Sequence, residues 1–308
     1  ILLPQVLIFV VKQNQNHLMK LKIVYSIILS LFWGIGHAQH EGNYLLWEIS
    51  HPKSKQVSYL FGTIHLLKKD DLVIGKTLEK AYSNSENLFL EIDLSNPENM
   101  VNASIKSMLP NGSTFENACP DSIQKAIEFK MKSIVGISSS EWTMLKMIKP
   151  IFWTPIVIEK LIPNLSEGYD MFFMQQAKKS KQKIIGLETS DEAMASIDQV
   201  PLIEQYEYFA SFIEQRDSSI QEIEALMNAY KNRDLIKIKS ILESSLMDMK
   251  SGKEALLEDR NKAWMKKLIP AIRSNSCFIA VGAGHLTGAD GLISLLRKEG
   301  FIVKGIQE

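Results

Sequence analysis

Short apolar runs bounded by turn residues recur along the chain and predict buried strands. One run covers residues 44–50 and a second covers 56–61, and the polar stretch 51–55 between them contains a proline. This arrangement predicts a β-hairpin. A third run, 87–93, follows the segment 70–85, whose apolar residues have helical spacing. The order strand, helix, strand indicates a sheet covered by helices.

The middle of the chain has mostly helical periodicity. Helices are predicted over 97–108, 121–131, 140–148, 171–181 and most of 190–275, with one strand at 183–189. Two last strands, 277–282 and 301–305, flank a helix at 290–299. We therefore predict an α/β (α+β) fold in which two related halves form one central mixed sheet, with a large helical insertion at about 97–275 between them. No linker divides residues 39–308, which indicates a single domain.

Two strands end in the same turn motif. Gly62-Thr-Ile-His65 closes the second run, and Gly282-Ala-Gly-His285 closes the run at 277–282. The chain has six histidines, and these two are the only ones after His51. Glycine at a strand end allows a sharp turn or a close approach, and sites in open sheets gather at strand ends. The matched pair favours a functional role over a structural one.

Glutamates occur in or at the end of two other predicted strands, as Glu91 and Glu188. Imidazole and carboxylate are common partners on a divalent metal, which can activate a bound water. We therefore predict that His65, His285 and Glu91 hold one metal. As structural alternatives, Glu91 faces solvent at a sheet edge, and Glu188 caps the next helix or faces water.

Three further polar residues are candidates for supporting roles. Arg260 could bind a substrate carboxylate or stabilise an oxyanion, although Arg260-Asn261 on an amphipathic helix could equally form a solvated face. Asp93 lies two residues after Glu91 and could orient a histidine or belong to a turn. The sequence contains no Gly-x-Ser-x-Gly elbow, His-Glu-x-x-His helix or phosphate loop. These absences argue against a classical serine hydrolase, a zincin and a nucleotide-binding protein.

The N-terminal region has the order of a secretory signal. Met19 is followed by two lysines, the apolar run 23–35 and the small-residue site Gly36-His37-Ala38. We predict an upstream extension at 1–18, a signal peptide at 19–38, and an exported chain that is periplasmic or secreted. The apolar run is short for a membrane span, and no second long run follows, so no span is expected in the mature chain.

Charge and cysteine content narrow the class of partner. Residues 39–308 carry 32 basic and 35 acidic residues without a basic block, which argues against nucleic acid as a partner. After export, Cys119 and Cys277 could form a disulfide, or each could remain a buried thiol. The sequence indicates no oligomeric state.

An ordered set of motifs resembles a known family. The motifs are Phe61-Gly-Thr-Ile-His65-Leu, Leu90-Glu91-Ile-Asp93, Gly168-Tyr-Asp170, Gly186-Leu-Glu188-Thr, Arg260-Asn261 and Val281-Gly-Ala-Gly-His285-Leu. In this order they resemble the TraB/PrgY/GumN family over about residues 43–306. That family is similar to the Tiki metalloproteases and, more distantly, to the erythromycin esterases and the ChaN-like haem-binding proteins.

The resemblance implies an α/β fold, a peptide or small-molecule substrate, and a hydrolase that uses a divalent metal, Mn²⁺ or Co²⁺ rather than Zn²⁺. It implies His65, His285 and Glu91 as metal ligands, with Glu91 and Arg260 as catalytic residues. Residues expected to support the site or bind substrate are Asp93, Asp170, Glu188, Asn261, Gly62 and Gly282. Two alternatives stay open. One is a non-catalytic protein that sequesters a peptide or haem, and the other is a metal-free esterase with histidine as general base.

Overall fold

The computed structural model describes residues 44–166, 168–247, 249 and 251–307. The predicted extension at 1–18 and signal peptide at 19–38 lie outside these residues. None of the helices in the described ranges combines the length and the apolarity that a membrane span requires.

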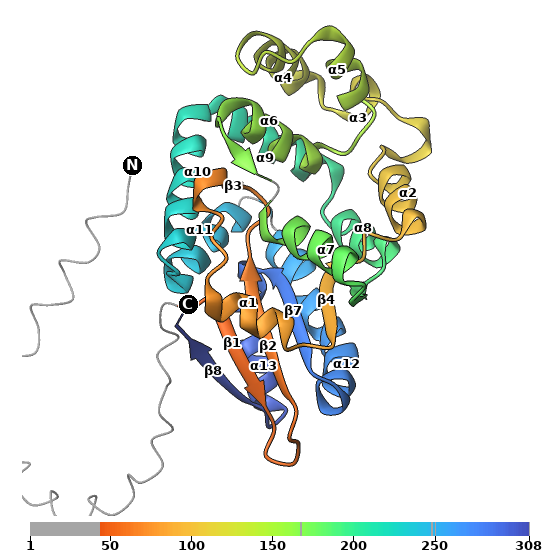
Figure 1. Ribbon diagram of the computed structural model, residues 1–308. Helices are drawn as coiled ribbons and strands as arrows, with labels where there is room; N and C mark the ends of the chain where they lie inside the picture. The colour runs from red at the N-terminus through yellow and green to blue at the C-terminus, as the bar shows by residue number, and fades with distance from the viewer. Residues whose placement is uncertain (1–43, 167, 248, 250, 308) are drawn as a thin grey trace, which may run out of the picture. The chain divides into compact units, whose positions relative to one another are not determined.

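A six-stranded mixed sheet forms the lower half of the molecule as drawn in Figure 1, with strand order β6-β4-β7-β2-β1-β8. Four neighbouring strands are parallel, and β1 pairs antiparallel with both β2 and β8. The strands are β1 (Leu46–Ser50), β2 (Val57–Thr63), β4 (Asn87–Ile92), β6 (Lys183–Glu188), β7 (Cys277–Gly282) and β8 (Ile302–Ile306). The predicted α/β class and mixed sheet are confirmed. The two halves interleave, because β4 of the first half pairs with β7 of the second.

The parallel strands are apolar because helices cover both faces of the sheet. Residues Cys277 to Val281 of β7 are all buried. Helices α1 (Lys76–Ser83) and α7 (Gly168–Ser180) lie on the near face in Figure 1, and α12 (Asp259–Ser274) and α13 (Leu292–Lys298) lie behind. Under α7, the ring of Phe173 lies 4.8 Å from that of Phe278 on β7 and 5.8 Å from that of Phe61 on β2, measured between centroids. Such aromatic pairs stabilise the layer beyond simple area burial.

A helical region extends beyond the carboxyl ends of the parallel strands (Figure 1). Its core is aromatic, since the ring of Trp153 contacts Phe115, Trp142, Tyr206 and Phe209 at centroid distances of 5.0–5.7 Å. The region confirms the predicted helical insertion. Its helices are α2 (Pro97–Lys106), α3 (Phe115–Ala118), α4 (Asp121–Ser133), α5 (Ser139–Leu145), α6 (Trp153–Leu161), α8 (Ser190–Asp198), α9 (Leu202–Glu214), α10 (Arg216–Lys231) and α11 (Leu235–Met247).

Several helix starts are defined by side-chain caps. The Asn96 side chain accepts from the Glu98 amide ahead of α2, and Ser138 and Thr189 form capping boxes ahead of α5 and α8. The differences from the prediction include an interrupted helix and an additional sheet. The helix predicted at 70–85 is a 3₁₀ turn at Lys69–Asp71 followed by α1, because the extended backbone of Gly75 separates them. A small second sheet of β3 (Leu67–Lys68) and β5 (Leu165–Ser166) was not predicted.

Both cysteines are buried free thiols, so the disulfide left open by the sequence is not formed in this structure. Burial raises the pKa of Cys119 to about 12 and that of Cys277 to about 11. Both side chains are therefore neutral and unreactive at physiological pH.

Candidate functional site

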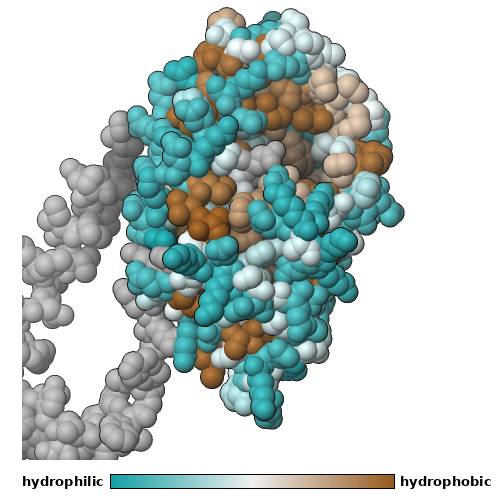
Figure 2. All heavy atoms as spheres, viewed as in Figure 1, coloured by the Kyte–Doolittle hydropathy of each residue, from teal (hydrophilic) through white to brown (hydrophobic). Residues whose placement is uncertain are grey.

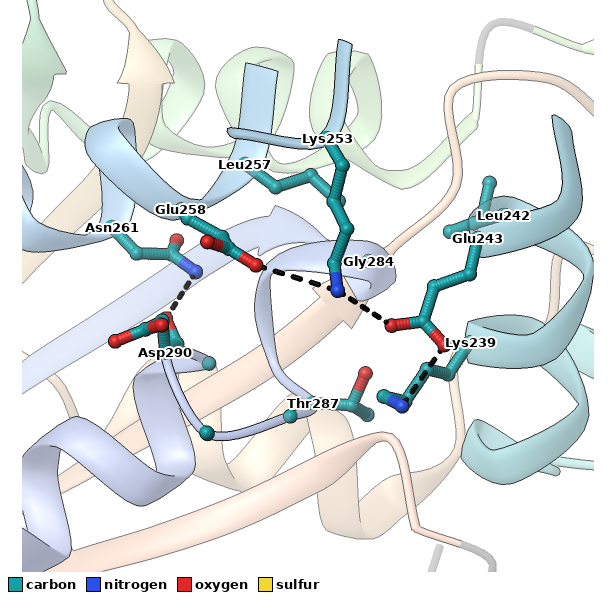
Figure 3. Close-up of a pocket in the computed structure, with 13 residues that line it drawn as sticks. Lys239, Leu242, Glu243, Lys253, Leu257, Glu258, Asn261, Gly284, Thr287 and Asp290 are labelled. Carbon is teal, nitrogen blue, oxygen red and sulfur yellow. Dashed lines mark hydrogen bonds and ion pairs between the residues drawn. The ribbon is translucent and has the colours of Figure 1, made fainter. Parts of the chain in front are cut away.

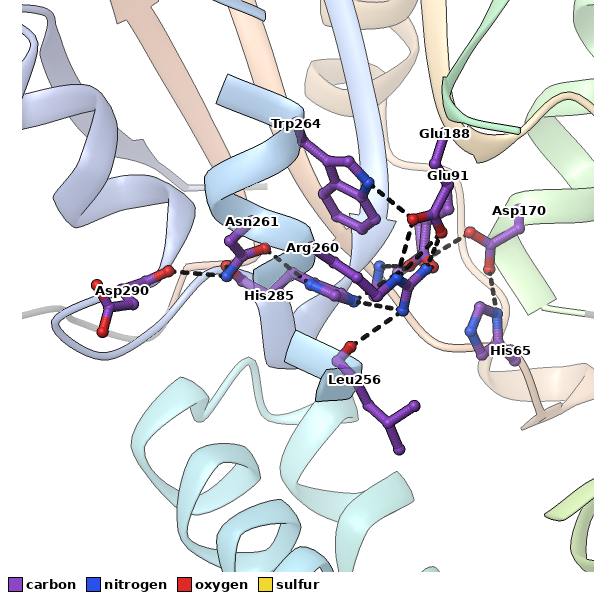
Figure 4. Close-up of polar contacts among 12 residues, drawn as sticks. His65, Glu91, Asp170, Glu188, Leu256, Arg260, Asn261, Trp264, His285 and Asp290 are labelled. Atoms are coloured by element: carbon purple, nitrogen blue, oxygen red, sulfur yellow. Dashed lines mark hydrogen bonds and ion pairs between the residues drawn. The ribbon is translucent and has the colours of Figure 1, made fainter. Parts of the chain in front are cut away.

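The carboxyl ends of the parallel strands bring two carboxylates and an imidazole to one edge of the sheet, and α12 adds a guanidinium (Figure 4). Glu91 lies near the end of β4, and Glu188 is the last residue of β6. His285 lies in a 3₁₀ turn, Ala283–His285, that directly follows β7. Parallel strands end at the same edge, so residues far apart in sequence become neighbours.

Arg260 is the hub of this cluster and comes from the first turn of α12. Its Nε donates to both carboxylate oxygens of Glu188, at 3.0 and 3.2 Å, and Nη2 donates to Glu188 Oε1 as well. Nη2 also donates to Glu91 Oε2 at 2.7 Å. Nη1 donates to the Leu256 carbonyl oxygen at 3.1 Å and lies 3.3 Å from His285 Nε2. One guanidinium thus bridges two carboxylates and the imidazole.

Asn261 determines the tautomer of His285. Its Nδ2 donates to the carbonyl oxygens of His285 and Asp290, at 3.2 and 2.9 Å, which leaves Oδ1 as the acceptor. Oδ1 lies 2.8 Å from His285 Nδ1, so Nδ1 carries the proton. The Nε2 lone pair then faces Arg260 and Glu91, and Nε2 lies 3.8 Å from Glu91 Oε1. A neutral imidazole with its lone pair turned into a cluster is suited to accept a proton or bind a cation.

The charge state of the cluster follows from burial and neighbours. Burial lowers the pKa of His285 to about 3, with Glu91 opposing the shift, so this ring is neutral. Burial opposes ionisation of Glu91, but His285, Arg260, His65 and the Gly282 amide together lower the pKa of this carboxyl. Because His285 is neutral at physiological pH, Arg260, His65 and the Gly282 amide are the partners that keep Glu91 ionised there.

Glu188 is in the opposite situation. Burial raises the pKa of Glu188, and the charge on Glu91 adds to the rise, while Arg260 opposes it. Trp264 Nε1 donates to Glu188 Oε2 at 3.2 Å, and the Arg260 guanidinium lies 4.9 Å from the Trp264 ring. With two carboxylates and one guanidinium, the cluster has a deficit of positive charge.

His65 lies at the rim of the site, although its motif matches that of His285. Its side chain is 70% exposed, and Nδ1 lies 3.0 Å from Asp170 Oδ2. Thr63 Oγ1 donates to Asp170 Oδ1 at 2.8 Å and fixes the carboxylate. The hydrogen bond and charge of Asp170 raise the pKa of His65 to about 9. The predicted pair of histidines therefore consists of a buried neutral ring and an exposed ring whose protonation Asp170 favours.

Three glycines allow the close approaches on which this geometry depends. The Gly282 amide donates to Glu91 Oε1 at 2.8 Å, and a Cβ on Gly282 would lie 3.3 Å from that oxygen. A Cβ on Gly62 would lie 3.0 Å from Leu286 Cδ2 in the turn that carries His285. Gly168 has φ +69° at the start of α7, and a Cβ there would lie 2.1 Å from the Ile64 carbonyl oxygen.

Asp93, the remaining predicted residue, serves a turn, and two residues that were not predicted, Trp264 and Thr63, contact the site. Asp93 adopts the turn alternative, because its Oδ1 accepts from the Ser95 amide at 2.9 Å. Trp264 and Thr63 were not singled out from the sequence. Trp264 lies four residues after Arg260 on the same helix face, and Thr63 lies two residues before His65. That spacing was the available signal.

The side chains of this cluster include the donor types that a divalent ion needs. His285 Nε2 and Glu91 Oε1 have the right chemistry and lie near each other, and the exposed ring of His65 completes the donor types. As the side chains lie, no three His, Cys, Asp or Glu groups among the described residues converge on one metal position. The donor chemistry fits an ion, while Arg260 engages the two buried donors.

A pocket of about 280 Å³ lies next to the cluster and shares Asn261 with it (Figure 3). Lys253 pairs with Glu243 and Glu258 across its wall, at 3.0 and 3.4 Å. The glycine-rich turn after His285 forms another wall. Its lining residues are Lys239, Leu242, Glu243, Lys253, Leu257, Glu258, Asn261, Gly284, Thr287, Gly288, Ala289, Asp290 and Gly291.

The fold and the site define an α/β protein with a histidine–glutamate–arginine cluster at the carboxyl edge of a mainly parallel sheet. The chain belongs to the TraB/PrgY/gumN family, whose model matches residues 45–305. The family suggested by the motifs is thereby confirmed.

Relatives of the chain include animal metalloproteases and a bacterial protein. It is 21% identical to metalloprotease TIKI2 of Danio rerio over 87% of its own length and 62% of that protein. It is 22% identical to metalloprotease TIKI1 of Xenopus tropicalis over 86% of its own length and 62% of that protein. It is 24% identical to the uncharacterized protein YbaP of Escherichia coli (strain K12) over 83% of its own length and 94% of that protein. The chain thus spans about three-fifths of the Tiki relatives. No solved structure matches it significantly.

Proposed function

We propose that this protein is a metal-dependent hydrolase of peptide bonds. The observation that carries the proposal is the buried pair of a neutral His285 and an ionised Glu91, with Nε2 and Oε1 3.8 Å apart. The names of the Tiki relatives, metalloproteases at about 21% identity, support the same reaction class.

Each residue of the cluster has a role in this proposal. His285 and Glu91 would hold the ion, and His65 would be the third ligand. The bound ion, Mn²⁺ or Co²⁺ rather than Zn²⁺, supplies Lewis acidity and lowers the pKa of a water molecule. Glu91 would take the proton from the attacking water and pass it to the leaving amine as the C–N bond breaks, and Arg260 would stabilise the oxyanion of the scissile carbonyl. Asn261 keeps the Nε2 lone pair directed into the site.

The surface of the helical region favours a polypeptide over a small substrate. Figure 2 shows apolar side chains gathered over the helical region on one face of the molecule. Exposed apolar patches mark interaction surfaces, and flexible methionines adapt to varied partners. Large apolar residues exposed in the helical region include Met100, Val101, Ile105, Met108, Phe129, Met144 and Met147.

The test combines metal content with peptide cleavage. Protein dialysed against Mn²⁺, Co²⁺ or Zn²⁺ should carry about one ion per chain by plasma mass spectrometry, and His65→Ala/His285→Ala should carry none. A peptide library should be cleaved by the loaded protein and spared by Glu91→Gln. A matched control is Glu243→Gln, whose carboxylate lies in the neighbouring pocket. Absence of cleavage with every metal would contradict the proposed reaction.

A metal-free hydrolase is the second candidate, because Arg260 engages both buried donors and no three ligand groups among the described residues converge. In this route His285 Nε2 acts as general base and Arg260 binds the oxyanion. Full cleavage activity in the presence of a strong chelator would favour this route, and loss of activity would favour the metal-dependent one.

We also propose that the chain is exported and acts in the periplasm or outside the cell. The signal-like segment at 19–38 supports this location.

A further inference from the structure

The guanidinium of Arg260 lies where a cation would meet its first two ligands. Nη2 donates to Glu91 Oε2 at 2.7 Å, and Nη1 lies 3.3 Å from His285 Nε2. The two acceptors belong to one cluster, since Glu91 Oε1 lies 3.8 Å from the same Nε2. Figure 4 shows the guanidinium between the carboxylates and the imidazole. A single positive group thus already serves both buried donors.

A metal ion and this arrangement of Arg260 exclude each other. Because Asn261 holds the proton of His285 on Nδ1, Nε2 has one lone pair. That lone pair can accept a guanidinium proton or bind a metal, and it cannot do both. A divalent ion bound to nitrogen at about 2.0–2.2 Å would also face the like charge of Arg260 in a buried site.

Other contacts would retain Arg260 after it leaves these donors. Nε donates to both oxygens of Glu188, at 3.0 and 3.2 Å, and Nη1 donates to the Leu256 carbonyl oxygen. Leu256 lies in a π-helical stretch, Glu254–Glu258, that immediately precedes α12. Such stretches are rare and frequently occur at functional sites. Glu188 is therefore suited to hold the displaced guanidinium.

We propose that Arg260 and a divalent cation compete for Glu91 and His285, and that Glu188 holds Arg260 when the cation is bound. This inference rests on the metal dependence in the proposed function. In the metal-free protein Arg260 compensates the charge of Glu91. On metal binding it withdraws toward Glu188 and remains beside the site, where its positive charge can act on substrate.

The first experiment measures Co²⁺ affinity by equilibrium dialysis in the full chain and in Arg260→Gln. Removing the competitor should lower the apparent Kd for Co²⁺ at least tenfold. The added substitution His285→Ala should abolish this gain. Arg273→Gln is the matched control, because Arg273 is exposed on the same helix away from the cluster. This variant should bind Co²⁺ as the unmodified chain does.

A second measurement needs no folded Arg260→Gln protein. Zn²⁺ is diamagnetic, so it can be titrated into the unmodified chain while arginine side-chain N–H signals are followed by NMR. The Arg260 signal, assigned by its absence in Arg260→Lys, should shift with the same apparent Kd as Zn²⁺ binding. The signal of Arg273 should not move.

An unchanged Co²⁺ affinity in folded Arg260→Gln, or Zn²⁺ binding that leaves the Arg260 signal in place, would overturn the inference. Neither readout depends on activity. Peptide cleavage by the unmodified chain therefore decides the proposed function separately.

Discussion

At the scale of single residues, the hydrogen bonds of a few side chains explain the geometry of the site. Arg260 bridges Glu91, Glu188 and His285, and Asn261 assigns the tautomer of His285. Burial, neighbouring charges and hydrogen bonds set the protonation state of each ionisable group in the site. Two predictions concern these contacts.

Substitution of Asn261 by alanine should loosen both His285 and the turn that follows it. The change removes two donors and one acceptor from buried partners, and an unsatisfied buried group destabilises a fold by about 1–3 kcal/mol. Urea denaturation should give a loss in this range, and ¹⁵N NMR should show a smaller Nδ1-protonated fraction of His285. Lys262→Ala, an exposed neighbour, should change stability by less than about 0.5 kcal/mol. An unaltered tautomer in Asn261→Ala would refute the assignment.

Substitution of Asp170 by asparagine should lower the pKa of His65 from about 9 toward its ordinary value, because the hydrogen bond to the carboxylate is the main cause of the rise. The raised pKa means that the pair stabilises the fold below about pH 6.5 and that this contribution is lost as pH rises through about 9. The effect on stability should be small, since the ring is 70% exposed. NMR titration in chelator measures the midpoint, with Asp191→Asn as a surface control. A midpoint that does not fall would contradict the role of Asp170.

At the scale of elements, the site depends on how strand ends are joined to helices. Thr189 caps α8 directly after Glu188, and α7 begins at Gly168, which brings Asp170 to His65. Gly168 has a left-handed backbone and touches the loop after β2. A side chain at this position would meet both a conformational and a steric obstacle.

The substitution Gly168→Ala should destabilise the fold more than Gly112→Ala. The two glycines have φ of +69° and +68°, so both substitutions carry the conformational penalty of about 1–2 kcal/mol. Only Gly168 has a close neighbour, the Ile64 carbonyl oxygen at 2.1 Å, while nothing lies within 4 Å of a Cβ on Gly112. Free energies of unfolding, measured by urea denaturation, should differ by at least about 2 kcal/mol between the variants. Equal losses of unfolding free energy in the two variants would mean that the backbone at Ile64 moves to accommodate the added methyl group.

At the scale of the whole molecule, the sheet and the helical region meet at the site. The sheet supplies Glu91, Glu188 and His285 from three strand ends, and α12 supplies Arg260 across the sequence. Apolar surface is exposed on the helical region beside that edge (Figure 2). This arrangement suits a substrate longer than the site itself.

The proposed export predicts where the mature chain begins. N-terminal sequencing of protein recovered from its native host should begin at Gln39, because the small-residue site ends at Ala38. Replacing Ala38 by a bulky residue such as tryptophan should block this cleavage, whereas Gln39→Glu should leave it in place. Soluble cytoplasmic protein with an intact 19–38 segment would contradict export.

The sequence by itself determined the sheet, the helical insertion and the motifs that carry the site. Strands buried on both faces are continuous apolar runs, and glycine-rich turns after them are visible without coordinates, so Glu91, His65, His285 and the family followed from local pattern. Arg260 became a strong candidate only through the resemblance, because a charged residue on an amphipathic helix has many ordinary roles.

Only the tertiary structure decided how these residues differ and combine. His65 and His285 share a motif, yet one is exposed beside Asp170 and the other is buried under α12. Burial and charge depend on elements that are distant in sequence, and local pattern does not encode them. The same reason explains why Glu188 binds Arg260 and why the two halves of the sheet interleave.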